Sequence, residues 1–312
     1  MMNWPFTVSD LGDSCRLGVH APAEPAAPPS RSDRILLGMP HLSGNGLSEI
    51  WLLKELGHRH WLLLAESAGR PAPDFRDEAG QPVYAAFCAL SIEDANFAAA
   101  RANDRLRITS SLARLSRTQM SSRHHLAIED RPIGVVTMIS TFVRRAPDGG
   151  NHTVARVAIE GLPPVGEGTS ASKLAGLAAG FRAGRVERHM GFDLHRESEL
   201  GTWTFNPCPS LDFNGAGFLY FASFVVMVDR AEWRFEPVLA RAVATVRRDV
   251  FFYGNVDRCE TVTACLLARR EPTGALIHHC RLRRGSDGAV IGDVFTTRTV
   301  ADRVTTETVG GV

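Results

Sequence analysis

The chain has 312 residues, which is long enough for two packed domains or for one duplicated domain. Its hydrophobic content of 44% is ordinary for a globular protein, and a net charge of +1 gives no reason to expect nucleic acid or an anionic membrane surface as a partner. The 6 cysteines are far apart and form no Cys-x-x-Cys pair, which argues against a zinc site and a secreted disulfide scaffold.

The N-terminal segment, residues 1–33, is predicted to be a tether. Residues 21–33 form a Pro/Ala/Ser tract that cannot build a regular hydrogen-bond ladder. The first residues lack the basic stretch and apolar core of a signal peptide, and no apolar run reaches membrane-spanning length. We therefore expect a cytoplasmic protein whose ordered structure begins near Arg34.

Residues 34–160 have the pattern of one helix followed by several strands. Apolar residues recur at helical spacing from Leu47 to Glu66, with charged residues between them. Strands are predicted at Val83–Ile92, within residues 97–115, at Pro132–Val143 and at Thr153–Ile159.

Residues 161–200 are predicted to connect two halves, since residues 161–185 are rich in Gly, Ala, Ser and Pro and have only a weak helical stretch at Lys173–Arg182. Residues 201–302 then repeat the order of the first half, and residues 303–312 are expected to be a tail. Helices are predicted from Gly217 to about Glu232 and at Pro237–Val243. The predicted strands are Trp203–Phe205, Asp249–Tyr253, Glu260–Arg269, Gly274–Arg284 and Val290–Thr299.

A short motif precedes the apolar helix in both halves. It reads Pro40-His-Leu-Ser-Gly-Asn-Gly in the first half and Pro209-Ser-Leu-Asp-Phe-Asn-Gly in the second, with Pro, Leu, Asn and Gly in register. Asn-Gly is also a common turn, so the motif alone does not establish a duplication. Together with the repeated order of elements, it predicts two similar halves.

An antiparallel sheet wrapped around a long apolar helix is the hot-dog fold, and two in tandem form a double hot-dog. The stretch Phe218–Val228 has almost no polar face, which fits a helix enclosed by a curled sheet. We therefore predict an α+β double hot-dog, with residues 34–160 as the first hot-dog and residues 201–302 as the second.

Two segments of the second half resemble a known family, the LnmK-like acyltransferase/decarboxylases of polyketide biosynthesis. They are Asp212-Phe-Asn-Gly-Ala-Gly-Phe-Leu-Tyr-Phe-Ala-Ser-Phe224 and Phe252-Tyr-Gly-Asn-Val-Asp257. The resemblance covers most of residues 34–300 and is strongest in 209–257. It implies an enzyme that takes an acyl group from acyl-CoA, typically methylmalonyl-CoA, decarboxylates it and passes it to an acyl carrier protein. The entry to the first helix departs from the family pattern, which indicates a sister subfamily.

The resemblance also implies a nucleophile, Tyr84. In the family the acyl group is held on a tyrosine after a turn, and here Tyr84 follows Asp77-Glu-Ala-Gly-Gln-Pro82. It further implies the phosphopantetheine arm of a carrier protein as a partner, a homodimer, and no metal or other cofactor. A tyrosine hydroxyl has a pKa of about 10, so this role needs a neighbouring base or strong hydrogen-bond donors. An ordinary half-buried strand tyrosine is the alternative.

The repeated motif supplies candidates for holding the thioester oxygen. Negative charge grows on that oxygen in acyl transfer and in enolate formation, and a helix start offers free N–H groups and a positive dipole end. Asn214 is therefore predicted to be catalytic, although a turn and a helix cap are the alternative for either copy of the motif. The residues predicted to bind substrate are Asn45, Gly46, Gly215, Gly217, Tyr253 and Asn255.

Three alternative functions stay open. His41 and Asp212 occupy matching places in the two copies of the motif, like the His and Asp of double hot-dog dehydratases, and are kept as candidate catalytic residues. The usual flanking residues are missing, because Asn45 stands at a glycine position and Ala216 at a Gln/His position. A hot-dog thioesterase would hydrolyse the thioester. A non-catalytic module that binds acyl chains or carrier proteins is favoured if Tyr84 and Asn214 do not share a cavity.

No metal site is expected from the paired histidines. Neighbours two apart on a helix, or adjacent on a strand, project to different sides. Each is expected to lie at the surface or to make a single hydrogen bond; the pairs are His58/His60, His124/His125 and His278/His279.

Overall fold

The computed structural model describes residues 30–146, 149–162, 164–165, 170–237 and 243–300. The first half forms α1 (Glu49–Ser67) and strands β1 (Ser30–Leu36), β5 (Pro82–Glu93), β6 (Arg105–Arg114), β7 (Gln119–Ile128) and β8 (Arg131–Arg145). The second half repeats this order with α4 (Phe221–Phe235), β12 (Gly201–Phe205), β13 (Val243–Phe252), β14 (Val262–Arg270), β15 (Ala275–Arg284) and β16 (Val290–Val300). The two halves therefore have the same architecture, as the repeated motif predicted.

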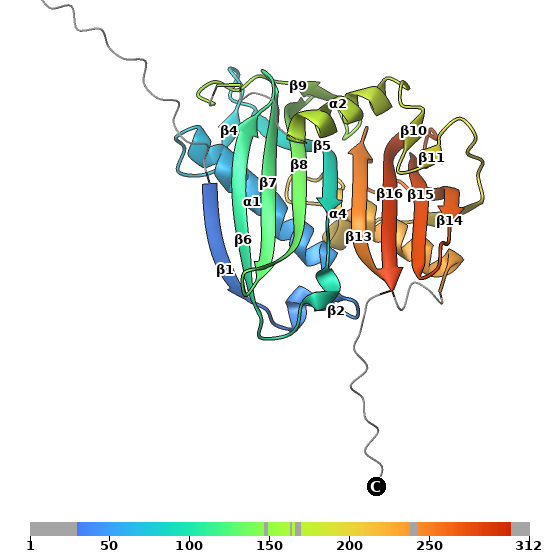
Figure 1. Ribbon diagram of the computed structural model, residues 1–312. Helices are drawn as coiled ribbons and strands as arrows, with labels where there is room; N and C mark the ends of the chain where they lie inside the picture. Colours follow the sequence, from blue (N-terminus) through green and yellow to red (C-terminus); the bar gives the residue numbers. More distant parts are fainter. Residues whose placement is uncertain (1–29, 147–148, 163, 166–169, 238–242, 301–312) are drawn as a thin grey trace, which may run out of the picture.

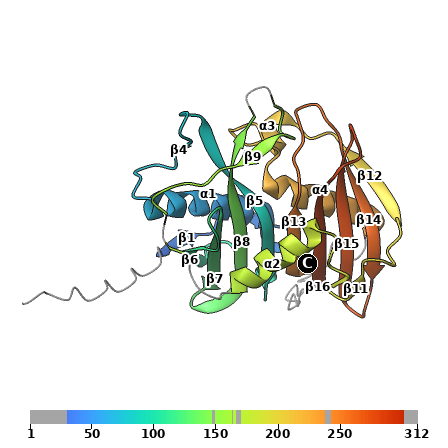
Figure 2. The same cartoon turned by 90° about the horizontal axis from the view of Figure 1, so that it is seen from above.

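These strands form one antiparallel sheet in the order β1-β6-β7-β8-β5-β13-β16-β15-β14-β12, so β5 and β13 join the two halves. Helices α1 and α4 lie on one face of the sheet, and α2 (Ser170–Arg182) lies on the other (Figures 1 and 2). This arrangement confirms the predicted α+β double hot-dog.

Short elements complete the chain. Near the start of each long helix lie 3-10 helix η1 (Met39–His41), the β2 (Leu42–Ser43) and β3 (Gly46–Leu47) pair, and helix α3 (Pro209–Asp212). The others are β4 (Phe75–Arg76), η2 (Phe97–Ala99), β9 (Val154–Arg156), β10 (Arg188–His189) and β11 (Phe192–Asp193). No helix in the described part of the chain is long and apolar enough to cross a membrane.

The two long helices run antiparallel and share one apolar core with the inner face of the sheet. The middle of α1 contacts the start of α4, where a Cβ on Gly57 would lie 2.8 Å from the Phe221 ring. At the other end, Glu49 and Asp229 both lie close to Arg248. The start of each helix therefore lies beside the second half of the other.

Several boundaries differ from the prediction. β1 begins at Ser30 rather than Arg34, because the residues after the last proline pair with β6. α4 begins at Phe221 rather than Gly217, because Gly217 has a φ of +79° and lies in a turn. Residues 238–242 of the predicted helical piece lie outside the described residues, and Val243 begins β13. The predicted strand at Thr153–Ile159 is limited to Val154–Arg156.

The interior holds more polar side chains than the sequence predicted. His60 lies between Ser122 and Ser140, with ring-nitrogen-to-Oγ distances of 2.7 and 2.8 Å. His124 lies between Ser110 and the same Ser122, at 2.8 and 2.9 Å. The expectation of a surface position or a single bond is wrong for these two histidines, since both are fully buried with two partners. It is also wrong for His279, which lies between Glu197 and Asp293.

Candidate active site

A cavity of about 500 Å³ lies at one end of the helix pair. β5 pairs with β13 only from Ala89 to Ile92, and towards Pro82 it continues without this partner. The cavity lies beside the part of β5 that does not pair with β13. Its walls come from the second half of α1, β5, β9, the end of α2, the loop and first turn of α4, and the loop after β13.

All 3 tyrosines of the protein line this cavity. The ring of Tyr84 is half-buried and meets the edge of Phe218 at a centroid distance of 5.4 Å. Among the described residues, nothing is hydrogen-bonded to the Tyr84 hydroxyl. The Tyr253 hydroxyl donates to Asp293 Oδ2 at 2.9 Å, and burial together with that carboxylate raises its pKa. Burial raises the pKa of Tyr220 to about 12.

Asn214 lies in the same cavity as Tyr84. Separate positions for these two residues would have favoured a non-catalytic binding module. The Asn214 Oδ1 accepts the N–H groups of Ala216 at 3.0 Å and Phe218 at 3.1 Å. These bonds fix the side-chain amide and leave Nδ2 without a partner in the described part of the chain. The neighbouring Gly215 also lines the cavity, and a Cβ there would meet no atom within 4 Å.

Asn255 lines the cavity, but its amide is occupied by the protein. It accepts the Leu219 N–H at 2.8 Å and donates to the Leu219 carbonyl at 3.1 Å. This two-way bond holds the loop that leads into α4. The structure therefore shows Asn255 positioning the cavity wall, whereas the sequence predicted that it binds substrate.

His41 and Asp212 do not line the cavity and play equivalent local roles. The His41 Nδ1 accepts the Gly38 N–H at 2.7 Å, and Asp212 Oδ2 accepts the Cys208 N–H at 2.8 Å. Each residue ends a short helix before a long helix, and the long helices are antiparallel. The two side chains therefore lie at opposite ends of the helix pair, which contradicts their predicted role as a catalytic His/Asp pair.

Asn45, Gly46 and Gly217 also lie outside the cavity lining. Asn45 lines a separate cavity of about 180 Å³ at the start of α1, where its Nδ2 donates to the Val243 carbonyl at 3.0 Å. The Gly217 carbonyl accepts a hydrogen bond from Asn151 at 2.7 Å. For these three residues the structure shows turn and packing contacts.

Replacing Gly46 with alanine is expected to lower the free energy of unfolding by about 2 kcal/mol or more. Gly46 has a φ of +100°, and a Cβ there would lie 2.1 Å from the Phe97 carbonyl oxygen. Gly44→Ala is the matched control, because a Cβ at that position would meet nothing within 4 Å. Urea unfolding of both variants measures the difference, and equal stabilities would contradict this account of Gly46.

Two arginines line the cavity, a feature that the sequence did not predict. They are Arg156 and Arg182, and no Asp or Glu is among the described lining residues. The Arg182 Nη2 donates to the Phe252 carbonyl at 2.8 Å, while Arg156 is exposed on β9. Positive charge in a largely apolar cavity favours a ligand with an anionic group.

The corresponding end of the helix pair, near the start of α1, has a different composition, with charged side chains beside cavities of about 180 and 560 Å³. Arg248 is fully buried there and donates to Asp229 at 2.8 Å. Arg298 also bonds Asp229, and its Nε lies 3.1 Å from Glu232. The duplicated fold thus has an aromatic cavity at one end and an ion-pair cluster at the other.

No protein-family model and no curated protein matches this chain. Similar solved structures include an acyl-ACP thioesterase from Bacteroides thetaiotaomicron, with a TM-score of 0.60 and 10% identity over 86% of this chain and 97% of that chain. The 12:0-ACP thioesterase from Umbellularia californica has a TM-score of 0.60 and 8% identity over 87% and 94%. A structure described as an oleoyl thioesterase from Lactobacillus plantarum has a TM-score of 0.60 and 14% identity over 89% and 98%. At these identities the similarity shows the fold.

Proposed function

We propose that this protein is an enzyme that binds an acyl thioester of CoA or of an acyl carrier protein in the cavity beside Tyr84 and Asn214. The observation that carries the proposal is that these two residues, far apart in the sequence, line one largely aromatic cavity. Its volume of about 500 Å³ is in the range of small-molecule sites. The substrate class is further supported by the similar structures, which are named as thioesterases, two of them for acyl-ACP.

The proposed reaction is acyl transfer through Tyr84, as the family resemblance implies. The Tyr84 oxygen attacks the thioester carbonyl, the carbon–sulfur bond breaks, and the departing thiolate receives the phenolic proton. A malonyl-type acyl group then loses CO2, and the resulting enolate carbon is protonated. The thiol of the carrier's phosphopantetheine arm attacks the tyrosyl ester, and the Tyr84 oxygen recovers a proton.

The surroundings favour Tyr84 over the other two tyrosines as nucleophile. Tyr253 is bonded to a carboxylate and Tyr220 has a raised pKa, so neither forms a phenolate readily. The free Nδ2 of Asn214 and the first N–H groups of α4, whose N-cap Tyr220 makes no side-chain cap, would hold the oxyanion or enolate oxygen. Arg156 and Arg182 would attract the carboxylate or phosphates of the substrate.

The proposed function is tested by incubating the protein with malonyl-, methylmalonyl- and acetyl-CoA, with and without a phosphopantetheinylated carrier protein. We expect CoA release and acyl-carrier formation, both abolished by Ala86→Trp, which fills the cavity. Ala72→Trp, at an exposed loop position, is the matched control and should retain activity. CoA release without acyl-carrier would indicate hydrolysis, and binding without any product would indicate a non-catalytic module.

A further inference from the structure

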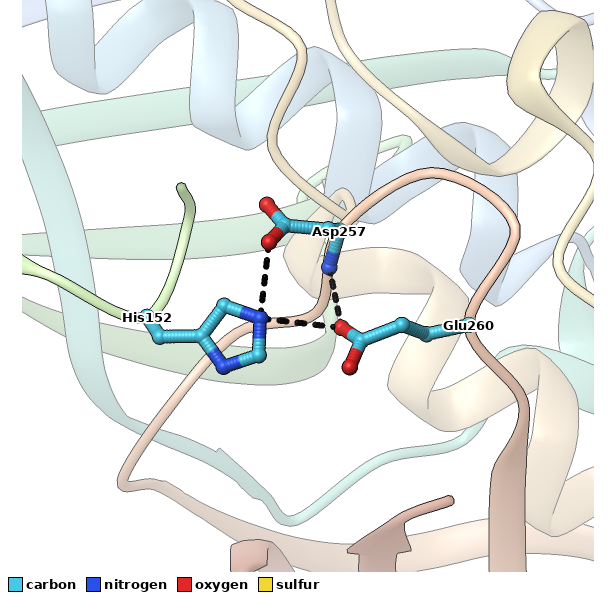
Figure 3. A group of neighbouring side chains, drawn as sticks. All are labelled: His152, Asp257 and Glu260. Atoms are coloured by element: carbon cyan, nitrogen blue, oxygen red, sulfur yellow. Dashed lines mark hydrogen bonds and ion pairs between the residues drawn. The ribbon is translucent and has the colours of Figure 1, made fainter. Parts of the chain in front are cut away.

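Three side chains converge beside the cavity, and the reaction proposed above does not use them. The His152 Nε2 lies 2.8 Å from Asp257 Oδ2 and 3.1 Å from Glu260 Oε2 (Figure 3). His152 precedes β9 in the first half, while both acids lie in the loop between β13 and β14 of the second half. His152 also lines the cavity, so the cluster lies at the cavity rim.

The two carboxylates are held in place by backbone donors. Asp257 Oδ1 accepts the Asn151 N–H at 2.6 Å, and Glu260 Oε2 accepts the Asp257 N–H at 2.5 Å. The close approach of Asp257 requires Gly150, because a Cβ there would lie 2.2 Å from Asp257 Oδ2. The donor atoms are therefore positioned by the fold before any ligand binds.

Arg284 is the cation that acts on both carboxylates electrostatically, but it forms its ion pair with Asp287. In the described part of the chain, no Lys or Arg lies within ion-pair distance of Asp257 or Glu260, and their partner in such a pair is His152. One imidazole N–H cannot give both carboxylates a full hydrogen bond. A divalent cation would bind the ring nitrogen and both carboxylates together.

The spacing of the donor atoms allows one metal ion to contact all three residues. Ligand atoms at tetrahedral angles around an ion with bonds of about 2.0–2.1 Å lie about 3.3 Å apart. The separations of 2.8 and 3.1 Å from His152 Nε2 to the two acids need only a small expansion, and the two carboxylates offer oxygens within 4.8 Å of each other. One histidine and two carboxylates suit Zn²⁺ and related transition metals, and three protein ligands leave a position open for water or a ligand.

We propose that His152, Asp257 and Glu260 bind a divalent transition-metal ion, with zinc as the favoured ion, at the rim of the cavity. The donor atoms of the three residues all lie within 4.8 Å of one another. The site goes beyond the proposed function, because acyl transfer through Tyr84 takes place without it. The sequence analysis predicted no metal, because His152 is far from Asp257 and Glu260 along the chain and the three residues form no recognisable motif.

The experiment uses tag-free full-length protein that has been treated with a chelator and then equilibrated with ZnCl2, MnCl2 or MgCl2. Metal content after gel filtration and the Tm are measured. We expect about one Zn²⁺ per chain and a raised Tm, with little effect of Mg²⁺. Glu260→Gln and His152→Ala should each weaken zinc binding by about tenfold or more.

His125→Ala is the matched control, because it removes an exposed histidine that lies outside the cluster, and it should bind zinc like the wild type. Glu260→Gln keeps an oxygen that can accept the Asp257 N–H, so it separates metal binding from loop stability. Absence of stoichiometric zinc, or zinc binding that both ligand variants leave unchanged, would overturn the proposal. Neither readout depends on acyl-thioester turnover, so failure here leaves the proposed function standing.

Discussion

Replacing Tyr84 with phenylalanine is expected to reduce acyl transfer from CoA to a carrier protein by about 10³-fold or more, since the variant lacks the attacking oxygen. The ring and its edge contact with Phe218 are kept, so the cavity should retain its shape. Substrate binding should change little, because the aromatic wall and the cationic side chains are unaltered. The effect should therefore appear in kcat, measured by steady-state release of CoA, with KM nearly unchanged.

Tyr220→Phe and Tyr253→Phe are the matched controls for this prediction. Both remove a hydroxyl from the same cavity, and both should retain transfer activity within about tenfold, since both hydroxyls have raised pKa values and form phenolates less readily. Full activity of Tyr84→Phe would remove the nucleophile assignment. Loss of activity in Tyr253→Phe alone would transfer the role to the hydroxyl that is bonded to Asp293.

Acidification from pH 6.5 to pH 4.5 is expected to lower the free energy of unfolding steeply. The rings of His60 and His124 are joined through Ser122, and neither has a carboxylate partner among the described residues. Burial lowers the pKa of each to about 3, well below the value of about 6.5 in an unfolded chain. The unfolded chain therefore takes up protons that the folded protein excludes.

The contribution of these histidines is complete above pH 6.5 and is lost as the pH falls towards 3. Each contributes up to about 1.4 kcal/mol per pH unit within that window, so the pair contributes about 3 kcal/mol per unit at most. Depressed carboxylate pKa values, such as the value of about 2 for Asp293, affect stability only at lower pH. Above pH 4.5 the slope therefore comes from histidines, and the buried His278, whose pKa is also lowered, adds to the share of His60 and His124.

Urea unfolding followed by circular dichroism at several pH values measures this slope. His124→Gln, which cannot be protonated, should lower the slope between pH 6.5 and 4.5 by up to about 1.4 kcal/mol per pH unit, whatever its effect on stability at pH 7.5. His125→Gln is the control, because that side chain is exposed. A stability that stays constant from pH 7 to pH 5 would show that the buried histidines do not act in this way.

The fold was largely predictable because its signals are local. The apolar periodicity of α1 and α4 and the repeated motif before them are visible in the sequence, and they required two similar halves. β7 was not predicted as a separate strand, because its buried side chains include Ser121 on one face and Ser122 and His124 on the other, which hide the apolar alternation. Those polar residues are tolerated because partners on other elements satisfy them, and such partners are not visible locally.

Some residues of the candidate site were predicted from the sequence, and others were missed because they come together only in the folded chain. Tyr84 and Asn214 came from the resemblance and the repeated motif, and the structure brings them into one cavity. His41 and Asp212 were misread because their equivalence in the repeat reflects a backbone-capping role rather than shared chemistry. Arg156, Arg182 and His152 were missed because only the folded chain brings them to the cavity wall.

Intact-protein mass spectrometry after incubation with methylmalonyl-CoA and, separately, malonyl-CoA tests whether this protein processes thioesters through Tyr84. We predict a mass gain that matches one propionyl or acetyl group on the wild-type chain, and no gain on Tyr84→Phe. The same adduct on Tyr84→Phe, or CoA release by the wild type with no adduct trapped at any time, would contradict the claim.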